Sequence, residues 1–295
     1  MIDMLENGIW TGPIMDQHIH LDKNNLFLRA VDDFFIAGGT AINLVHKPDF
    51  NNLPKSLNDY QMAYNETLEM ANEIREKYEI SVNVILGPHP VAWEKQIIPL
   101  GIDRATELHI QAVDLALEHI KEKNAVCLGE VGRPHYPVND KVWRFANELL
   151  LQIMQKAAKN KVSIQLHVED NGYKTYSDIS GMCKISKLPK KRTIRHFAPS
   201  DISSDFTHGI SSTINVGKGC IKEIIETLPE SESYWGMETD YLDDLNRPGA
   251  VLGPKTVPKR TQELSQTLWK SDYSDNKIIE LMLNIHSKWP SELYP

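Results

Sequence analysis

The chain has 295 residues, of which 41% are hydrophobic and 24% charged, and its formal net charge is −8. These values are ordinary for a globular protein, and the acidic balance is untypical of a protein with a broad basic surface for nucleic acid. The three cysteines are too widely spaced for a metal knuckle or a disulfide framework, and neither a secretory signal nor an apolar stretch of the ~18 residues that a membrane span needs is visible. We therefore expect a soluble, cytoplasmic protein with no membrane partner.

Eight short apolar segments rich in β-branched residues alternate with stretches of helical periodicity. Continuous apolar runs are typical of strands that are covered on both faces, as in a parallel sheet. In chain order, the predicted strands span residues 14–20, 40–46, 80–87, 125–132, 162–168, 193–197, 211–217 and 234–240.

The segments between these strands carry apolar residues at helical spacing. The connection over 198–210 is short and polar, which predicts no more than a single turn. Strand–helix alternation repeated eight times predicts a (β/α)₈ TIM barrel, possibly distorted, that forms one domain over residues 1–295. The predicted helices span 59–78, 104–123, 141–159, 218–227 and 259–288, the last one interrupted at 271–275.

Six residues with metal-ligating side chains lie at the C-terminal ends of these strands. His18 and His20 are two apart on one strand, so that both point to the same side. Glu130 follows an apolar run between two glycines, where a carboxylate is costly to bury unless it is paired or bound to metal. The C-terminal ends of barrel strands meet on one face, so the set predicts a single cage of imidazoles and carboxylates, the ligands of zinc and related cations. Its members are His18, His20, Glu130, His167, His196 and Asp240.

The runs DQHIHLD, GPHP, GEVG, LHVED, RHF and METDYL, from Asp16 to about Leu242, resemble the ordered motifs of TatD-type metal-dependent hydrolases in the amidohydrolase superfamily. The resemblance implies a distorted barrel and metal-dependent hydrolysis of phosphoesters, often of DNA. It implies one or two divalent ions, with zinc expected first and manganese, magnesium or iron as alternatives. A metal-activated water would attack the substrate. The implied roles are one metal on His18 and His20, a bridging Glu130, a second metal on His167 and His196, and Asp240 as a ligand that also handles the proton.

Five further residues are candidates for supporting roles. His89 in GPHP matches the family's position for substrate contact, although a histidine that caps a loop is the alternative. Arg133 and His135 follow Glu130 closely and are candidates for binding an anionic group, with a solvated loop as the alternative. Asp16 and Glu238 share strand faces with metal ligands, so they would orient ligating histidines from one layer below or bond to backbone and water instead.

Two segments depart from the family's usual motifs. The chain reads GEVGRPHYP after the fourth strand and HVEDNGYK after the fifth, and Glu169 and Asp170 would repel a polyanion unless they turn away. The leading prediction is a metal-dependent hydrolase of phosphodiesters, with a phosphoester, possibly DNA, as substrate. A small-molecule amidohydrolase or lactonase that uses the same cage is the alternative, and a noncatalytic metal-binding barrel is the lesser one.

Overall fold

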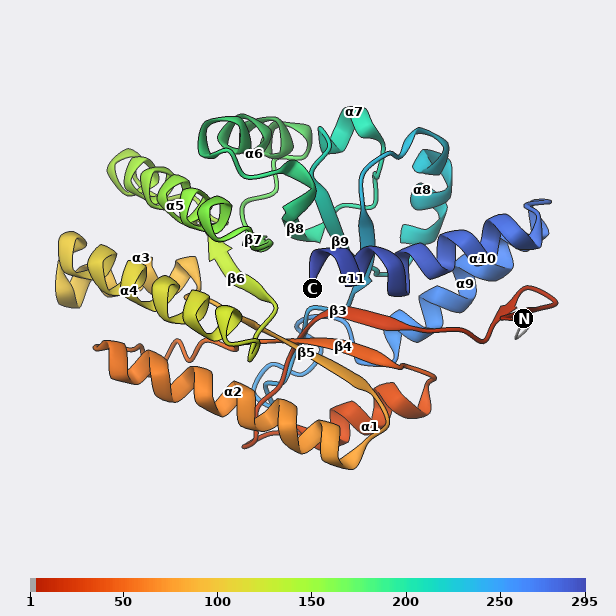
Figure 1. Cartoon of the computed structure of the whole chain (residues 1–295), viewed down its shortest axis with the longest axis horizontal. Coiled ribbons are helices and arrows are strands. Elements are labelled where there is room, and N and C mark those ends of the chain that lie inside the picture. Colours follow the sequence, from red (N-terminus) through yellow and green to blue (C-terminus); the bar gives the residue numbers. More distant parts are fainter. Residues whose placement is uncertain (1–3) are drawn as a thin grey trace.

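A curled sheet of parallel strands forms the centre of the computed structural model, which describes residues 4–295 (Figure 1). The nine strands follow the order β10-β9-β8-β7-β6-β5-β4-β3-β11, so that strands which follow one another in the chain lie side by side. All of these pairs are parallel, as the predicted alternation requires. The strands are β3 (Met15–His20), β4 (Ala41–Val45), β5 (Ser81–Leu86), β6 (Cys127–Gly132), β7 (Ile164–His167), β8 (Thr193–Ala198), β9 (Ser211–Asn215), β10 (Trp235–Glu238) and β11 (Tyr241–Leu242).

The two edges of the sheet meet at the last strand, which is divided into β10 and β11. The first piece pairs with β9, whereas the second pairs with β3, where Leu242 lies opposite His20. Between them, the backbone N–H of Asp240 donates to the carbonyl of His18 over 3.0 Å. One short segment thus joins both edges, which confirms the predicted barrel and locates its distortion where β3 meets the last strand.

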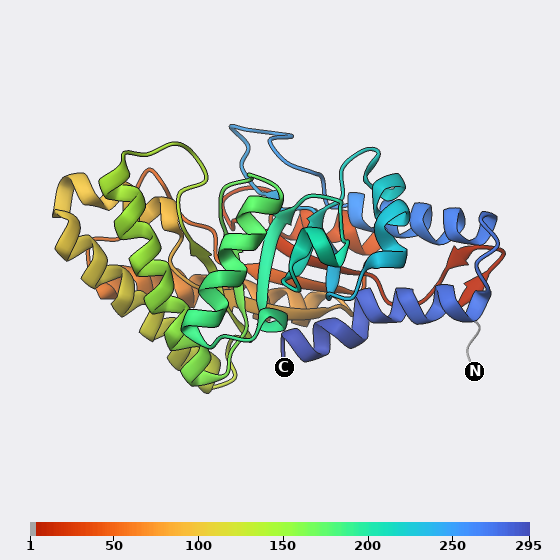
Figure 2. The ribbon, with the colours of Figure 1, turned by 90° about the horizontal axis from the view of Figure 1, so that it is seen from above.

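Helices cover the outside of the sheet (Figures 1 and 2). Each predicted helix is present within about two or three residues of its expected bounds, the 198–210 connection contains a single helical turn, and the C-terminal helix is interrupted where its sequence predicts. Helices α1, α3, α6 and α11 lie in segments for which we predicted no helix. The helices are α1 (Leu28–Ile36), α2 (Leu57–Lys77), α3 (Pro90–Leu100), α4 (Ile102–Lys121), α5 (Asp140–Asn160), α6 (Tyr173–Ser186), α7 (Ser204–Thr207), α8 (Cys220–Thr227), α9 (Thr256–Lys270), α10 (Asp275–Leu283) and α11 (Trp289–Leu293).

Local signals explain where several of these helices begin. Helix α2 starts with a capping box, in which the Ser56 hydroxyl accepts from the N–H of Asp59 and the Asp59 carboxylate accepts from that of Ser56. Helix α5 is capped by Asn139. Helix α3 is capped by His89, whose Nδ1 accepts the N–H of Val91 over 3.1 Å. That last cap fixes a histidine at the carboxyl end of β5, close to the predicted cage.

The C-terminal segment returns to the barrel. A π-helical turn, η3 (Asn284–Lys288), lies between α10 and α11, and the chain ends close to β3 (Figure 1). The Nδ1 atom of His286 accepts from the N–H of Met15 over 3.1 Å, so this segment is bound directly to the first barrel strand. A small antiparallel hairpin, β1 (Leu5–Glu6) and β2 (Ile9–Trp10), precedes the barrel. Within residues 4–295, none of the helices combines the length and the hydropathy needed to cross a bilayer.

Candidate metal centre

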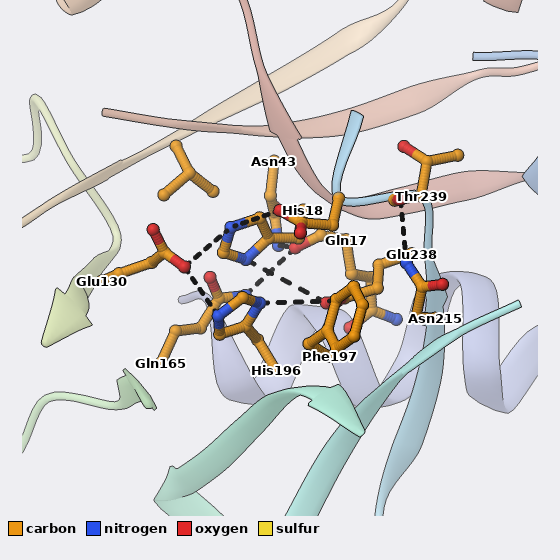
Figure 3. A network of polar contacts seen from close by, with 12 residues as sticks. Gln17, His18, Asn43, Glu130, Gln165, His196, Phe197, Asn215, Glu238 and Thr239 are labelled. Carbon is orange, nitrogen blue, oxygen red and sulfur yellow. Dashed lines mark hydrogen bonds and ion pairs between the residues drawn. The ribbon is translucent and has the colours of Figure 1, made fainter. Parts of the chain in front are cut away.

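The six residues expected to form the cage come together at the carboxyl ends of their strands, and Figure 3 shows His18, Glu130 and His196 among them. All but two of them are buried to within 4% exposure, His167 and Asp240 being partly exposed at the mouth. They are contributed by five regions of the sheet: β3 carries His18 and His20, β6 carries Glu130, β7 ends at His167, β8 carries His196, and Asp240 lies between β10 and β11.

One side of the cage consists of the two histidines of β3 and the aspartate of the last strand. The Nε2 atoms of His18 and His20 lie 3.2 Å apart. The Oδ1 atom of Asp240 lies 3.7 Å from Nε2 of His18 and 3.6 Å from Nε2 of His20. Three ligand atoms that all lie within 4.8 Å of one another can hold one cation between them.

The other side consists of His167 and His196. Nδ1 of His167 lies 3.0 Å from Nε2 of His196. Both atoms face Oε1 of Glu130, at 3.0 Å and 2.6 Å respectively. The second oxygen of Glu130, Oε2, lies 3.5 Å from Nε2 of His20. Oε1 also lies 3.6 Å from Nε2 of His18, so the Glu130 carboxylate stands between the two sides and contacts both.

The charges of the cage are strongly coupled. Burial alone would raise the pKa of Glu130, but His196, His89 and His167 outweigh it and hold that pKa well below its usual value. Burial alone would lower the pKa of His196, but the carboxylates of Glu130 and Glu238 raise it well above its usual value. In the metal-free protein a proton on His196 therefore partly compensates the charge of Glu130.

The remaining cage residues differ in protonation. Burial lowers the pKa of both His18 and His20, which leaves these imidazoles neutral with a lone pair available to a cation. Burial also raises the pKa of Asp240 well above its usual value, and the nearby carboxylates add to this.

Glu238 lies behind the cage. Nδ1 of His196 and Nδ1 of His18 face its carboxylate at 3.5 Å and 4.0 Å, and neither nitrogen has a hydrogen-bond partner among residues 4–295 (Figure 3). A cation on the Nε2 side would leave both Nδ1 atoms protonated and directed at this carboxylate, the arrangement that commonly orients metal-bound histidines. The donor set and its backing thus fit a divalent cation.

Asp16 has a different setting from Glu238. Its carboxylate accepts from the N–H and the hydroxyl of Thr239 at 3.1 Å and 2.6 Å, and from the backbone N–H of His18 at 3.2 Å. Burial raises its pKa to about 7. Asp16 therefore connects β3 to the last strand, and within residues 4–295 its carboxylate forms no hydrogen bond to an imidazole, which matches the backbone alternative.

His89 and His135 both border the cage. Because Nδ1 of His89 accepts from Val91, the neutral ring carries its proton on Nε2, which lies 3.5 Å from Oε2 of Glu130. His89 therefore presents a hydrogen-bond donor to the site. Nδ1 of the exposed His135 lies 2.6 Å from Nε2 of His167, so His135 contacts a predicted ligand rather than only solvent.

Arg133 does not face the site opening as its predicted role in anion binding requires. It is 1% exposed, and its guanidinium binds both oxygens of Glu169 at 2.6 Å and 2.8 Å as well as Asp178 and Asn147. Its place in the sequence suggested an anion contact, but its guanidinium is already bound by the carboxylates of Glu169 and Asp178. We interpret Arg133 as a support for the loop of Glu169.

The acidic pair at the mouth is neutralised by two buried arginines. Glu169 is bound by Arg133, and Asp170 accepts from Nη2 of Arg195 over 2.7 Å. The expected repulsion of a polyanion by this pair is therefore largely removed. A third cation, Lys47, is bound to Asp22 over 2.5 Å and to the carbonyl of Asp243.

Sequence reasoning missed a set of polar residues beneath the cage. Asn43, Gln165 and Tyr294 reach into the barrel below His18 and bond to Gln17 (Figure 3 shows the first two). The available signal was an amide residue inside otherwise apolar strands, as in AINLV and SIQLH.

The chain is similar to known proteins along most of its length. The family model described as TatD related DNase matches residues 15–282. An uncharacterised protein, MJ1127, of Methanocaldococcus jannaschii is 29% identical over 261 residues, which cover 85% of this chain and 87% of that protein.

Two solved structures are similar in fold. The TatD homologue YJJV of Escherichia coli has a TM-score of 0.59 at 17% identity, with 95% of this chain and 97% of that chain covered. A variant of an organophosphorus hydrolase from Deinococcus radiodurans has a TM-score of 0.59 at 10% identity, with coverage of 96% and 92%. The chain belongs to the family of TatD-related DNases and is a metal-dependent hydrolase.

Proposed function

We propose that this hydrolase cleaves phosphodiester bonds with two divalent cations held by the six-residue cage. The observation that carries the proposal is the position of Glu130, which faces His167 and His196 with one oxygen and His20 with the other. A carboxylate that faces two ligand groups in this way suits a pair of cations, and paired cations are typical of phosphoester hydrolases. Zinc is the metal that we expect first, because four of the six ligands are imidazoles.

Each neighbouring residue then has a role that its geometry supports. Bound cations would lower the pKa of a water and withdraw charge from the substrate oxygen. Asp240, whose pKa burial raises, is the residue to take the proton of the attacking water and return it to the leaving group. His89 carries its proton on Nε2 and would donate to a phosphoryl oxygen near Glu130.

A small-molecule amidohydrolase or lactonase is the second candidate, and the charges at the mouth favour it. Arg133, Arg195 and Lys47 are each bound to an acidic side chain, so these cations are not available to hold a nucleic-acid backbone. A mouth of this kind suits a small substrate or the end of a strand better than the middle of a long polyanion.

The test is a substrate comparison with the metal-loaded protein. Turnover of bis-(p-nitrophenyl) phosphate, single-stranded DNA and a panel of lactones would be measured with zinc, manganese and magnesium. Phosphodiester turnover that exceeds lactone turnover supports the proposal, and the reverse order supports the second candidate. The Asp240→Asn protein serves as the control. A substrate that this variant hydrolyses as fast as the wild-type protein is not cleaved at this site.

A further inference from the structure

We infer that a layer of amide side chains beneath the cage, completed by the hydroxyl of Tyr294, positions His18 for its metal. The layer consists of Gln17, Asn43 and Gln165, and together with Tyr294 it joins the C-terminal segment to the first metal-ligating strand. This inference rests on the proposed metal centre and adds positioning residues to it.

The peptide bond between Gln17 and His18 is held by side chains of neighbouring strands. The pairing of β3 with β4 shifts register between Asp16 and Ile19, so the carbonyl of Gln17 does not take part in a regular ladder. That carbonyl instead accepts from Nδ2 of Asn43 at 3.1 Å and from Nε2 of Gln165 at 3.0 Å. Asn43 comes from the neighbouring strand and Gln165 from β7, on another part of the barrel wall. Two side-chain amides thus fix the peptide bond next to a cage residue.

The C-terminal segment also bonds to this layer. Nε2 of Gln165 also donates to the Tyr294 oxygen at 3.0 Å, and the Tyr294 hydroxyl donates to Oε1 of Gln17 at 3.3 Å. Nε2 of Gln17 donates to the carbonyl of Ile285 at 2.9 Å. The backbone carbonyl and the side chain of Gln17 are therefore both held, and Tyr294 connects the residues that hold them.

The burial of this polar layer has a cost in free energy. Gln17, Asn43, Gln165 and Tyr294 are between 0% and 4% exposed, and buried polar groups are costly unless they are hydrogen-bonded. The barrel also makes room for the layer: a Cβ at Gly236 would lie 1.9 Å from Nε2 of Gln17. An apolar filling would close a barrel as well, so a connected polar layer directly under His18 is better explained by positioning. Metal ligands must be held to within about 0.5 Å, which such a layer provides.

The experiment compares Tyr294→Phe and Gln165→Met with the wild-type protein. Tyr64→Phe is the matched control, because its buried hydroxyl donates to the carbonyl of Ala112 at 3.3 Å outside the barrel interior. Two quantities are measured: the dissociation constant for Zn²⁺, and the ring ¹⁵N and ¹H chemical shifts of His18 in the metal-free protein. The second readout does not depend on activity or on bound metal.

We expect both layer variants to bind zinc about tenfold or more weakly, the size of effect that residues behind metal ligands usually have. We also expect them to shift the His18 ring resonances, whereas Tyr64→Phe should change zinc affinity less than about twofold and leave those resonances in place. Unchanged His18 resonances and zinc affinity in both layer variants would overturn the inference alone. A wild-type protein that takes up no zinc would overturn the metal centre itself and the inference with it.

Discussion

Zinc loading of the metal-free protein should release protons, and the site indicates which residues supply them. The pKa of His196 is raised well above 6.5, because Glu130 lies 2.6 Å and Glu238 3.5 Å from its ring nitrogens. At neutral pH this ring is therefore protonated, and a cation must displace its proton. The pKa values of His18 and His20 are lowered by burial, so these ligands release none.

The magnitude follows from linkage. Each displaced proton makes zinc affinity rise about tenfold per pH unit, or ~1.4 kcal/mol, as long as the pH is below the pKa of the group in the metal-free protein. We expect about one proton from His196 at pH 7. Asp240, whose pKa is also raised, should add to this number as the pH is lowered.

Calorimetric titration in two buffers of different ionisation enthalpy measures the number of protons released per protein. Glu130→Gln should reduce that number, because the amide no longer raises the pKa of His196. His46→Gln is the matched control: His46 is buried and bonded to Thr67, and burial lowers its pKa to about 4, so its ring is uncharged at pH 7 and has no imidazolium proton to release. Zinc affinity that stays constant between pH 6 and pH 8 would refute the reasoning.

Three further predictions concern activity and stability. Asp240→Asn should retain the far-UV circular dichroism of the fold and lose about 10²-fold or more in hydrolysis of bis-(p-nitrophenyl) phosphate, and undiminished turnover would remove Asp240 from the mechanism. Arg133→Met should lower the free energy of unfolding in urea by about 3 kcal/mol, because it leaves Glu169 without its arginine partner. Adding Glu169→Gln should restore part of that loss. A double variant as unstable as Arg133→Met alone would contradict this. His109 is buried, and neither of its ring nitrogens is hydrogen-bonded among residues 4–295. Burial lowers its pKa to about 3. Below pH ~6.5 the imidazole therefore binds a second proton in the unfolded chain but not in the folded protein. This costs about 2 kcal/mol of unfolding free energy by pH 5, and His109→Phe should flatten the dependence of stability on pH over that range, whereas identical slopes would argue against it.

The strand ends could be predicted because a local pattern determines them. Apolar runs identify buried strands, and parallel strands in a barrel bring their carboxyl ends to one face, so residues such as His167 and His196 could be assigned to one site without knowledge of their contacts. Glu130 could be included for a similar reason, since an acidic residue that ends an apolar run needs a partner.

The division of the last strand could not be predicted, because it depends on contacts between distant parts of the chain. Leu242 pairs with His20, more than two hundred residues earlier. The chain changes partner strands at Asp240, where φ is +51°, and Thr239 is held by Asp16. The predicted strand over 234–240 ends where this change begins, and no local pattern distinguishes a strand that ends from one that continues against a different neighbour.

The direction of Arg133 was also beyond the sequence. An arginine three residues after a cage residue suggested an anion contact. The preceding Gly132 has a φ of +158°, and a Cβ there would lie 1.9 Å from the carbonyl oxygen of His167. Only glycine allows β6 and β7 to approach so closely at this point. Arg133 then meets Glu169 and Asp178, whose positions depend on how α5 and α6 pack.

The paired charges at the mouth change what the net charge of −8 implies for the substrate. Glu169 and Asp170 are bound by arginines, so the potential that an incoming substrate meets depends mainly on the cage. In the metal-free protein the carboxylates of the cage are opposed chiefly by the proton on His196. Two divalent cations would outweigh the charges of Glu130 and Asp240 and make the same opening attractive to an anion. Affinity for a phosphodiester should therefore depend on metal loading far more than on surface charge. The net charge of −8 does not exclude an anionic substrate.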